Sequence, residues 1–258
     1  MKIAIIGAGA YGTALGGVLK TNGYKIEYYD PLLLPDVWLD EVVEGASAVL
    51  LVAPSMALPE LLPILPKELS LIVATKGILD TAVFSDFTDV SVISGPGFAD
   101  DIKAGKETCL TVTDERLMRM FAANFIKFDL TSDVRGVLMC GALKNVYAML
   151  AGYLGLLPGG PGYEEFIDEV LGEMRELLEA NGADGETVEL YCGVGDLRLT
   201  CDTPSRNYQY GAKLKSDASS RPETTVEGLS ALALIRDGAI KVPGGLKRLK
   251  QIMEIIWS

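Results

Sequence analysis

The sequence predicts an α/β protein with an N-terminal, mainly parallel β-sheet and a helical C-terminal domain. Up to about residue 130, short apolar and β-branched runs alternate with helix-like or loop segments, as in strands joined by crossover helices. Most of these runs are apolar throughout, which is expected where helices cover both faces of a sheet. After Asp133 the pattern changes to long helical periods. We therefore expect two domains, residues 1–132 and 133–258.

Seven runs are candidate strands of the first domain. In chain order they are KIAIIG, YKIEYYD, AVLLVAP, LIVATKG, VSVISGP, TCLTVT and, less regular, FIKFDL. In the second domain, YEEFIDEVLGEMRELLEANG places its apolar residues at helical spacing and ends at Gly182, a suitable helix cap. The segments LLPGGPG and SDASSRPETT have the composition of loops.

The segment GAGAYG lies between the first predicted strand and a helix-like segment. This context indicates a dinucleotide-binding loop of the Rossmann type, whose glycines allow a tight turn and let backbone amides approach a pyrophosphate. Asp30 ends the second strand, where a carboxylate can accept hydrogen bonds from ribose hydroxyls. Glycines that only form a turn are the alternative. The expected cofactor contacts in this domain are Gly7, Gly9, Ala10, Tyr11, Gly12, Asp30 and Pro54.

The residues around Asp30 favour NAD over NADP as the cofactor. A carboxylate at this position repels the 2′-phosphate of NADP. The next residues, PLLLP, supply no arginine that would bind that phosphate. Lys76 is a further candidate, because it follows a buried strand at the sheet edge where ligands bind, although an ordinary solvated lysine would fit the same position.

Composition excludes several classes of function. The chain has 258 residues, a net charge of −12 and no histidine. A strongly negative protein repels nucleic acid and anionic membranes, so neither is an expected partner. Proton transfer near neutral pH then falls to Lys, Asp, Glu, Tyr or Cys. The four cysteines form no close CxxC pair and MKIAIIGAG is not a secretory signal, so we expect no metal site and a cytoplasmic location.

One apolar segment, Val137 to Leu157, contains a single charged residue, Lys144. The segment is long enough to cross a bilayer. A lysine and Asn145 near its centre, with acidic residues on both sides, favour a buried core helix instead. Burying an ammonium group is costly, so Lys144 needs either a carboxylate partner or a chemical role.

Eight segments together resemble the NAD(P)-dependent glycerol-3-phosphate dehydrogenases. In the family's order they are GAGAYGTALG, VAPSMAL, ATKGI, ISGPGFADDIKAGKET, GALKNVYAMLAGYLGLL, GDLRLTC, SRNYQYG and TVEGLSAL, and the likeness extends to about residue 235. The resemblance implies the two-domain fold and the reversible reduction of dihydroxyacetone phosphate, a triose phosphate, to sn-glycerol 3-phosphate by NADH. It also implies a homodimer.

The resemblance assigns the proton donor to Lys144 and further catalytic roles to Lys76 and Asp196. Burial and the neighbouring Lys76 should lower the pKa of Lys144, whereas Asp196 should oppose that shift and orient the amine. The alternatives are structural: Lys144 could be a buried lysine that only pairs with a carboxylate, and Asp196 could only cap a turn. Substrate contacts fall on Asn145, Thr200, Arg206 and Asn207, and further cofactor contacts on Lys76, Arg206 and Glu227.

Three features depart from the family's pattern. The segment between the second and third strands, residues 31–47, is short, Met56 stands where many bacterial relatives place a histidine, and the C-terminal part is also short. Two other functions therefore remain open, a reductase of another keto acid such as ketopantoate and a dinucleotide sensor without turnover. Cys201 is a candidate nucleophile beside Thr200, but a small buried hydrophobic residue suits this position better.

Overall fold

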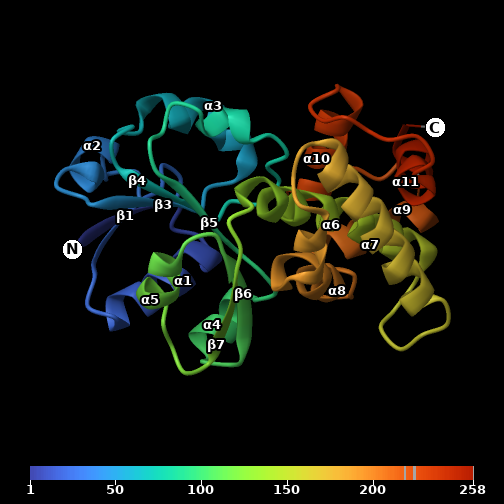
Figure 1. The fold of residues 1–258 in the computed structure, drawn as a ribbon, viewed down its shortest axis with the longest axis horizontal. Helices are drawn as coiled ribbons and strands as arrows, with labels where there is room; N and C mark the ends of the chain where they lie inside the picture. Colours follow the sequence, from blue (N-terminus) through green and yellow to red (C-terminus); the bar gives the residue numbers. More distant parts are fainter. Residues whose placement is uncertain (218, 223–224, 258) are drawn as a thin grey trace. The chain divides into compact units, whose positions relative to one another are not determined.

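The computed structural model describes residues 1–217, 219–222 and 225–257. It divides into two compact units, the first made of Met1–Thr75 and Thr81–Val134, the second of Lys76–Asp80 and Arg135–Ser258 (Figure 1). The division falls near the expected boundary, after Val134. Residues 76–80 also belong to the second unit, although they come before this boundary in the chain, so a single division of the sequence does not describe the two units fully.

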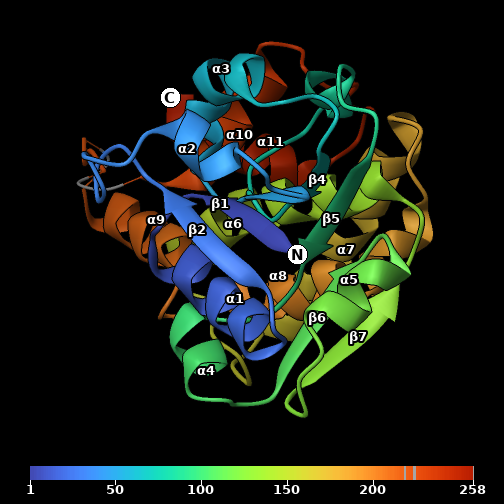
Figure 2. The same ribbon diagram turned by 90° about the vertical axis from the view of Figure 1, so that its left-hand side faces the viewer.

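The first unit contains a seven-stranded sheet in the order β2-β1-β3-β4-β5-β6-β7. All seven predicted runs form strands, so the predicted α/β class is confirmed. Strands β1 to β5 run parallel to one another, β6 runs antiparallel to β5, and β7 runs parallel to β6 (Figure 2). The strands are β1 Lys2–Ile6, β2 Lys25–Tyr29, β3 Ala48–Leu51, β4 Ser70–Val73, β5 Val90–Ser94, β6 Thr108–Val112 and β7 Ile126–Leu130.

Helices cover both faces of this sheet: α2 and α3 lie on one side, and α1 and α4 on the other (Figures 1 and 2). Apolar side chains of α1 pack with those of the central strands into one buried core. The helices are α1 Ala10–Thr21, α2 Leu39–Val43, α3 Leu58–Leu61, α4 Ala99–Lys103 and α5 Glu115–Met120, with 3₁₀ turns η1 Ser55–Ala57, η2 Leu62–Ile64 and η3 Thr81–Phe84.

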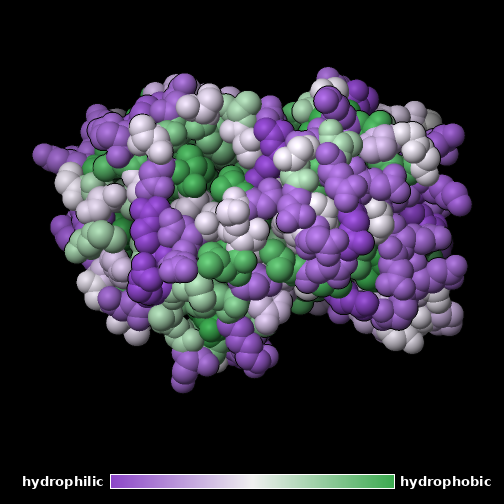
Figure 3. Space-filling model, viewed as in Figure 1, coloured by the Kyte–Doolittle hydropathy of each residue, from purple (hydrophilic) through white to green (hydrophobic). Residues whose placement is uncertain are grey.

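The second unit is helical. The predicted amphipathic helix is α7, which ends at Ala180 and is followed by Gly182 with φ of +73°, as expected for a cap. Its outer face is acidic, and the surface over α7 in Figure 3 is mainly hydrophilic. The helices are α6 Val134–Leu154, α7 Tyr163–Ala180, α8 Asp196–Thr200, α9 Arg206–Ser216, α10 Glu227–Arg236 and α11 Lys247–Trp257, with the 3₁₀ turn η4 Gly185–Glu189 and the π turn η5 Tyr191–Gly195.

Helix α6 is the centre of the second unit. By length and composition it is able to cross a membrane, with a mean hydropathy of 1.4, but 89% of that apolar window is buried inside the fold. Glycines let the neighbouring backbones approach it closely. A Cβ at Gly211 would lie 1.8 Å from the carbonyl oxygen of Met149, and one at Gly152 would lie 2.0 Å from that of Tyr208. Helix α6 is therefore apolar because other helices surround it. The predicted loop LLPGGPG joins α6 to α7, and part of SDASSRPETT lies outside the described residues.

Candidate active site

The glycine loop between β1 and α1 has the geometry of an anion-binding turn. Gly7 adopts φ of +113°, and a Cβ there would lie 2.9 Å from the backbone of Val52, so this position requires glycine. A Cβ at Gly12 would lie 2.1 Å from the carbonyl oxygen of Gly7, which shows how closely α1 packs on the loop. Gly9 has open space around its Cα and caps α1 without any side-chain bond. The first turn of a helix leaves backbone amides that the helix itself does not use, so the start of α1 suits an anion.

Asp30 lies next to this loop, at the end of β2. One carboxylate oxygen accepts a hydrogen bond from the amide of Ala8 at 2.9 Å. The other accepts bonds from the amides of Leu32 at 3.0 Å and Leu33 at 3.1 Å. Three backbone donors thus fix the carboxylate beside the glycine loop, where a dinucleotide would present its ribose. Pro54, the remaining predicted contact, follows β3 and is exposed.

Lys144 is held by a carboxylate inside the second unit. It lies in the middle of α6, only 3% exposed, and its ammonium pairs with Oδ1 of Asp196, which is 1% exposed. The other oxygen of the same carboxylate, Oδ2, accepts a hydrogen bond from Lys76 at 3.0 Å. Asp196 begins α8 directly after the π turn η5, an irregularity that often occurs at functional sites. The three predicted catalytic residues therefore form one cluster, in which Lys76 is the partly exposed member.

The surroundings of Lys144 in the fold lower the pKa of its amine from 10.5 to about 7. Burial is the main cause, because it disfavours the charged form, and Asp196 opposes this shift by stabilising the ammonium. The positive charge of Lys76 lowers the pKa further. The amine can therefore gain and lose a proton near neutral pH, in a chain that contains no histidine.

A second polar network lies beside this cluster, between α6, α9 and α10. Asn207 donates a hydrogen bond to the side-chain oxygen of Asn145 at 2.9 Å, and Asn145 donates to the carbonyl oxygen of Gly141 at 3.0 Å. The amide of Gly228 donates to the side-chain oxygen of Asn207 at 3.0 Å. Both asparagines are buried and bonded to each other. Their predicted contacts with substrate remain predictions, whereas a role in fixing three helices around Lys144 is visible in the fold.

The other predicted site residues differ in their surroundings. Thr200 is buried and donates to the backbone oxygen of Asp196 at 2.6 Å. Arg206 begins α9, is exposed, and makes no hydrogen bond or ion pair with any residue in the described ranges. Glu227 is partly buried at the start of α10. Cys201 is fully buried, and burial raises the pKa of its thiol to about 12, which argues against a thiolate nucleophile.

Sequence reasoning did not identify the backbone amide of Gly228 as part of this arrangement. A Cβ there would lie 2.5 Å from the carbonyl oxygen of Asn145, so only glycine lets α10 approach α6 so closely. The signal was the glycine that follows the glutamate in TVEGLSAL. Among the residues that the structure describes, no group of three or more acidic or cysteine side chains is suited to hold a metal ion.

The sequence of the chain is similar to those of several known proteins. Residues 133–256 match the profile of a family described as NAD-dependent glycerol-3-phosphate dehydrogenase C-terminus. A glycerol-3-phosphate dehydrogenase (NAD(P)+) of Brucella ovis is 32% identical over 269 residues, covering 86% of this chain and 82% of the relative. One of Maridesulfovibrio salexigens is 30% identical and covers 100% of this chain and 94% of the relative.

A solved structure extends this likeness to three dimensions. The crystal structure of glycerol-3-phosphate dehydrogenase from Coxiella burnetii matches with a TM-score of 0.82 and 26% identity, over 99% of this chain and 94% of that chain. The sequence identities, the nearly complete coverage and the shared fold lead to one conclusion. The chain belongs to the family of NAD(P)-dependent glycerol-3-phosphate dehydrogenases.

Proposed function

We propose that this protein catalyses reversible hydride transfer between NADH and dihydroxyacetone phosphate, giving sn-glycerol 3-phosphate, with Lys144 as the proton donor. The observation that carries the proposal is a buried ammonium whose pKa lies near 7 and whose position is fixed by Asp196. Reduction of a ketone places negative charge on its oxygen, and a cation at that oxygen stabilises the charge and then supplies the proton.

The first unit offers a suitable site for a nicotinamide dinucleotide. The start of α1 can bind the pyrophosphate through backbone amides that the helix itself does not use, and Gly9 leaves room for its close approach. The carboxylate of Asp30 can accept hydrogen bonds from the ribose hydroxyls. When bound, the nicotinamide supplies the hydride. The predicted contact at Glu227 would lie on the cofactor side.

The proton passes through Lys144. In the protonated state, two ammonium groups share one carboxylate, so the cluster carries a net charge of about +1 and attracts an oxygen that becomes negative. Once the proton has moved to that oxygen, the uncharged amine is tolerated because it is buried. Asp196 fixes the direction of the amine, and Lys76 keeps its pKa low enough for transfer.

Arg206 is the group best suited to bind the substrate phosphate. Its guanidinium is exposed and has no partner among the described residues, whereas Lys144 is already paired. A guanidinium can bind phosphate oxygens through two parallel hydrogen bonds, which a single ammonium cannot do. The predicted substrate contacts of Asn145, Thr200 and Asn207 would add to it.

We propose NAD as the preferred cofactor, because Asp30 would place a negative charge against a 2′-phosphate. We also propose a cytoplasmic homodimer, on the strength of the family resemblance alone. Light scattering on the purified protein tests the dimer, and a single monomeric species would contradict it. Fractionation of cells tests the location, and recovery of the protein outside the cytoplasmic fraction would contradict that part of the proposal.

The test of the reaction is the oxidation of NADH, followed by its absorbance, with dihydroxyacetone phosphate as substrate. We expect Lys144→Met to lower kcat/KM by about 10²- to 10⁴-fold, the usual contribution of a positioned acid. Lys241→Met is the matched control, because Lys241 is exposed in the same unit and should have no effect. Equal turnover by the wild type and Lys144→Met would show that the proton donor is another group.

The same assay separates the competing functions. A reductase of another keto acid would oxidise NADH with ketopantoate but not with dihydroxyacetone phosphate. A dinucleotide sensor would bind NADH without oxidising it in the presence of either substrate. Both outcomes contradict the proposed reaction and leave the family assignment unchanged.

A further inference from the structure

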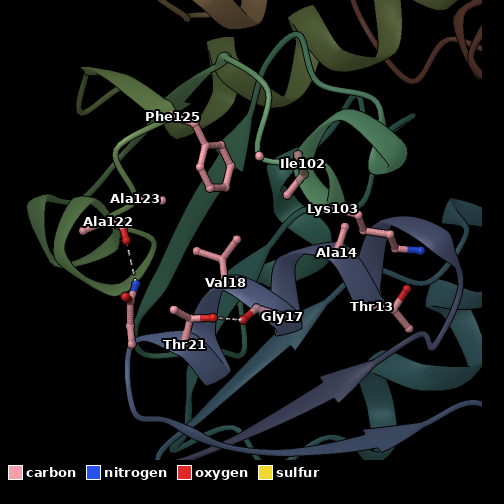
Figure 4. A pocket seen from close by; sticks show the side chains of 12 residues that line it. Thr13, Ala14, Gly17, Val18, Thr21, Ile102, Lys103, Ala122, Ala123 and Phe125 are labelled. Carbon is pink, nitrogen blue, oxygen red and sulfur yellow. Dashed lines mark hydrogen bonds between the residues drawn. The ribbon is translucent and has the colours of Figure 1, made fainter.

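The first unit contains a hollow of about 340 Å³ between α1, α4 and the residues before β7 (Figure 4). None of the residues expected to contact the dinucleotide belongs to its wall. One side of α1 and the residue after the helix line it, through Thr13, Ala14, Gly17, Val18, Thr21 and Asn22. Its volume falls in the range of small-molecule sites. The hollow is thus a separate feature from the glycine loop.

The wall combines an apolar interior with one cation. Figure 4 shows Phe125 and Ile102 pointing into the hollow towards Val18. The only charged lining residue is Lys103, an exposed side chain that makes no hydrogen bond or ion pair with the rest of the described chain. This uncompensated cation stands out in a protein with a net charge of −12.

The remaining polar groups of the wall have already used their hydrogens. Thr13 donates to the carbonyl oxygens of Gly9 and Ala10, both at 3.0 Å. Thr21 donates to Gly17 at 3.0 Å, and the amide group of Asn22 donates to two backbone oxygens at 2.9 Å. Lys103 is therefore the side-chain donor left for a ligand, and the group that it would recognise is an anion.

Gly17, in the wall of the hollow, is a second and independent indication of a ligand there. It lies inside α1, where glycine costs roughly 1 kcal/mol relative to alanine. Glycines at positions 12 and 16 have a packing reason, because a Cβ would lie 2.1 Å from Gly7 and 2.1 Å from Tyr28 respectively. A Cβ at Gly17 would meet nothing within 4 Å. The fold itself does not need the space that Gly17 leaves open at the wall of the hollow.

We propose that this hollow binds a small amphipathic anion, whose short alkyl chain packs against Phe125, Ile102 and Val18 and whose carboxylate or phosphate pairs with Lys103. Packing at about 30 Å³ for each non-hydrogen atom gives room for roughly ten atoms. Hexanoate and butyl phosphate are suitable probes of the two anion types, and hexanol is the neutral control of similar length.

The test is titration of the full chain with each probe, followed by NMR shifts of backbone amides. We expect both anions to shift the amides of Gly17 and Gly105 at lower concentration than hexanol does, and the tighter one identifies the anion type. Lys103→Gln should weaken anion binding about three- to fivefold without changing hexanol, the usual size of an exposed ion pair. Lys20→Gln is the matched control and should change nothing, because Lys20 is an exposed lysine of α1 that does not line the hollow.

A second part of the test uses variants whose larger side chains fill the hollow. Gly17→Leu should remove binding, and Ala123→Phe should do the same from the opposite wall if the first variant does not fold. Unchanged NADH binding by these variants shows that the first unit is intact. The proposal is overturned if no probe shifts Gly17, if hexanol binds as well as the anions, or if a folded filled variant still binds hexanoate with wild-type affinity.

Discussion

The lowered pKa of Lys144 makes the stability of the protein depend on pH in a specific direction. In the unfolded chain this lysine keeps its proton up to about pH 10.5, whereas in the folded protein it loses the proton around pH 7. Between these values the unfolded state binds more protons, so the free energy of unfolding rises with pH. The contribution of Lys144 is thus lowest below pH 7 and increases above it.

The size of the effect follows from these two pKa values. Integration from pH 7 to pH 8.5 gives an increase of about 1–2 kcal/mol in the free energy of unfolding. In a protein of this size that corresponds to a rise of about 4 °C in Tm. The window stops at pH 8.5 because the buried thiol of Cys201, with a raised pKa, contributes in the opposite direction at higher pH.

The measurement is calorimetry of the wild type and of Lys144→Met at pH 7.0, 7.5, 8.0 and 8.5, all chosen inside this interval. Methionine has a similar length and no titrating group, so the increase should vanish in the variant while other groups titrate as before. Lys241→Met, the exposed control, should retain the increase. Identical pH dependence in the wild type and Lys144→Met would refute the assigned pKa.

Three further outcomes are expected. Asp30→Ser should reduce the preference for NADH over NADPH by about tenfold or more in kcat/KM, and an unchanged ratio would contradict the role of the carboxylate. Tyr147→Phe should destabilise the protein in urea by about 1.5–3 kcal/mol, because it removes a buried bond of 2.9 Å to charged Glu173, and no change would show that the bond contributes nothing. Gly211→Ala should destabilise by about 3 kcal/mol through overpacking against α6, whereas Gly17→Ala should stabilise by up to about 1 kcal/mol; equal effects would contradict the packing difference.

Patterns along the chain were sufficient to predict much of the fold. The seven strands and α7 were predictable because each buries apolar residues with the period of its own element. The antiparallel direction of β6 was not predictable, since it depends on how the chain crosses between Ser94 and Thr108 and not on a local pattern. The short helices α2 to α5 were also missed, because helices of four to six residues carry little periodicity.

The candidate site was predictable to a different extent. Lys144 could be identified because a charge is rare in an apolar helix, and the resemblance supplied Lys76 and Asp196 as its neighbours. The sharing of one carboxylate by two lysines depends on segments 120 residues apart in the chain, Lys76 and Asp196, so no local pattern could reveal it. The bond between Asn145 and Asn207 was hidden for the same reason.

The carboxylate of Glu173 links the end of the described chain to the helix of Lys144. It accepts bonds from Tyr147 on α6 and from the amides of Arg248 and Leu249 at the start of α11, which lie 75 and 76 residues further along the chain. During synthesis, this buried charge therefore lacks two of its donors until α11 has left the ribosome. Proteolytic trimming of α11 would produce the same deficit in the finished protein, at a carboxyl group bonded to Tyr147, one turn of α6 after Lys144.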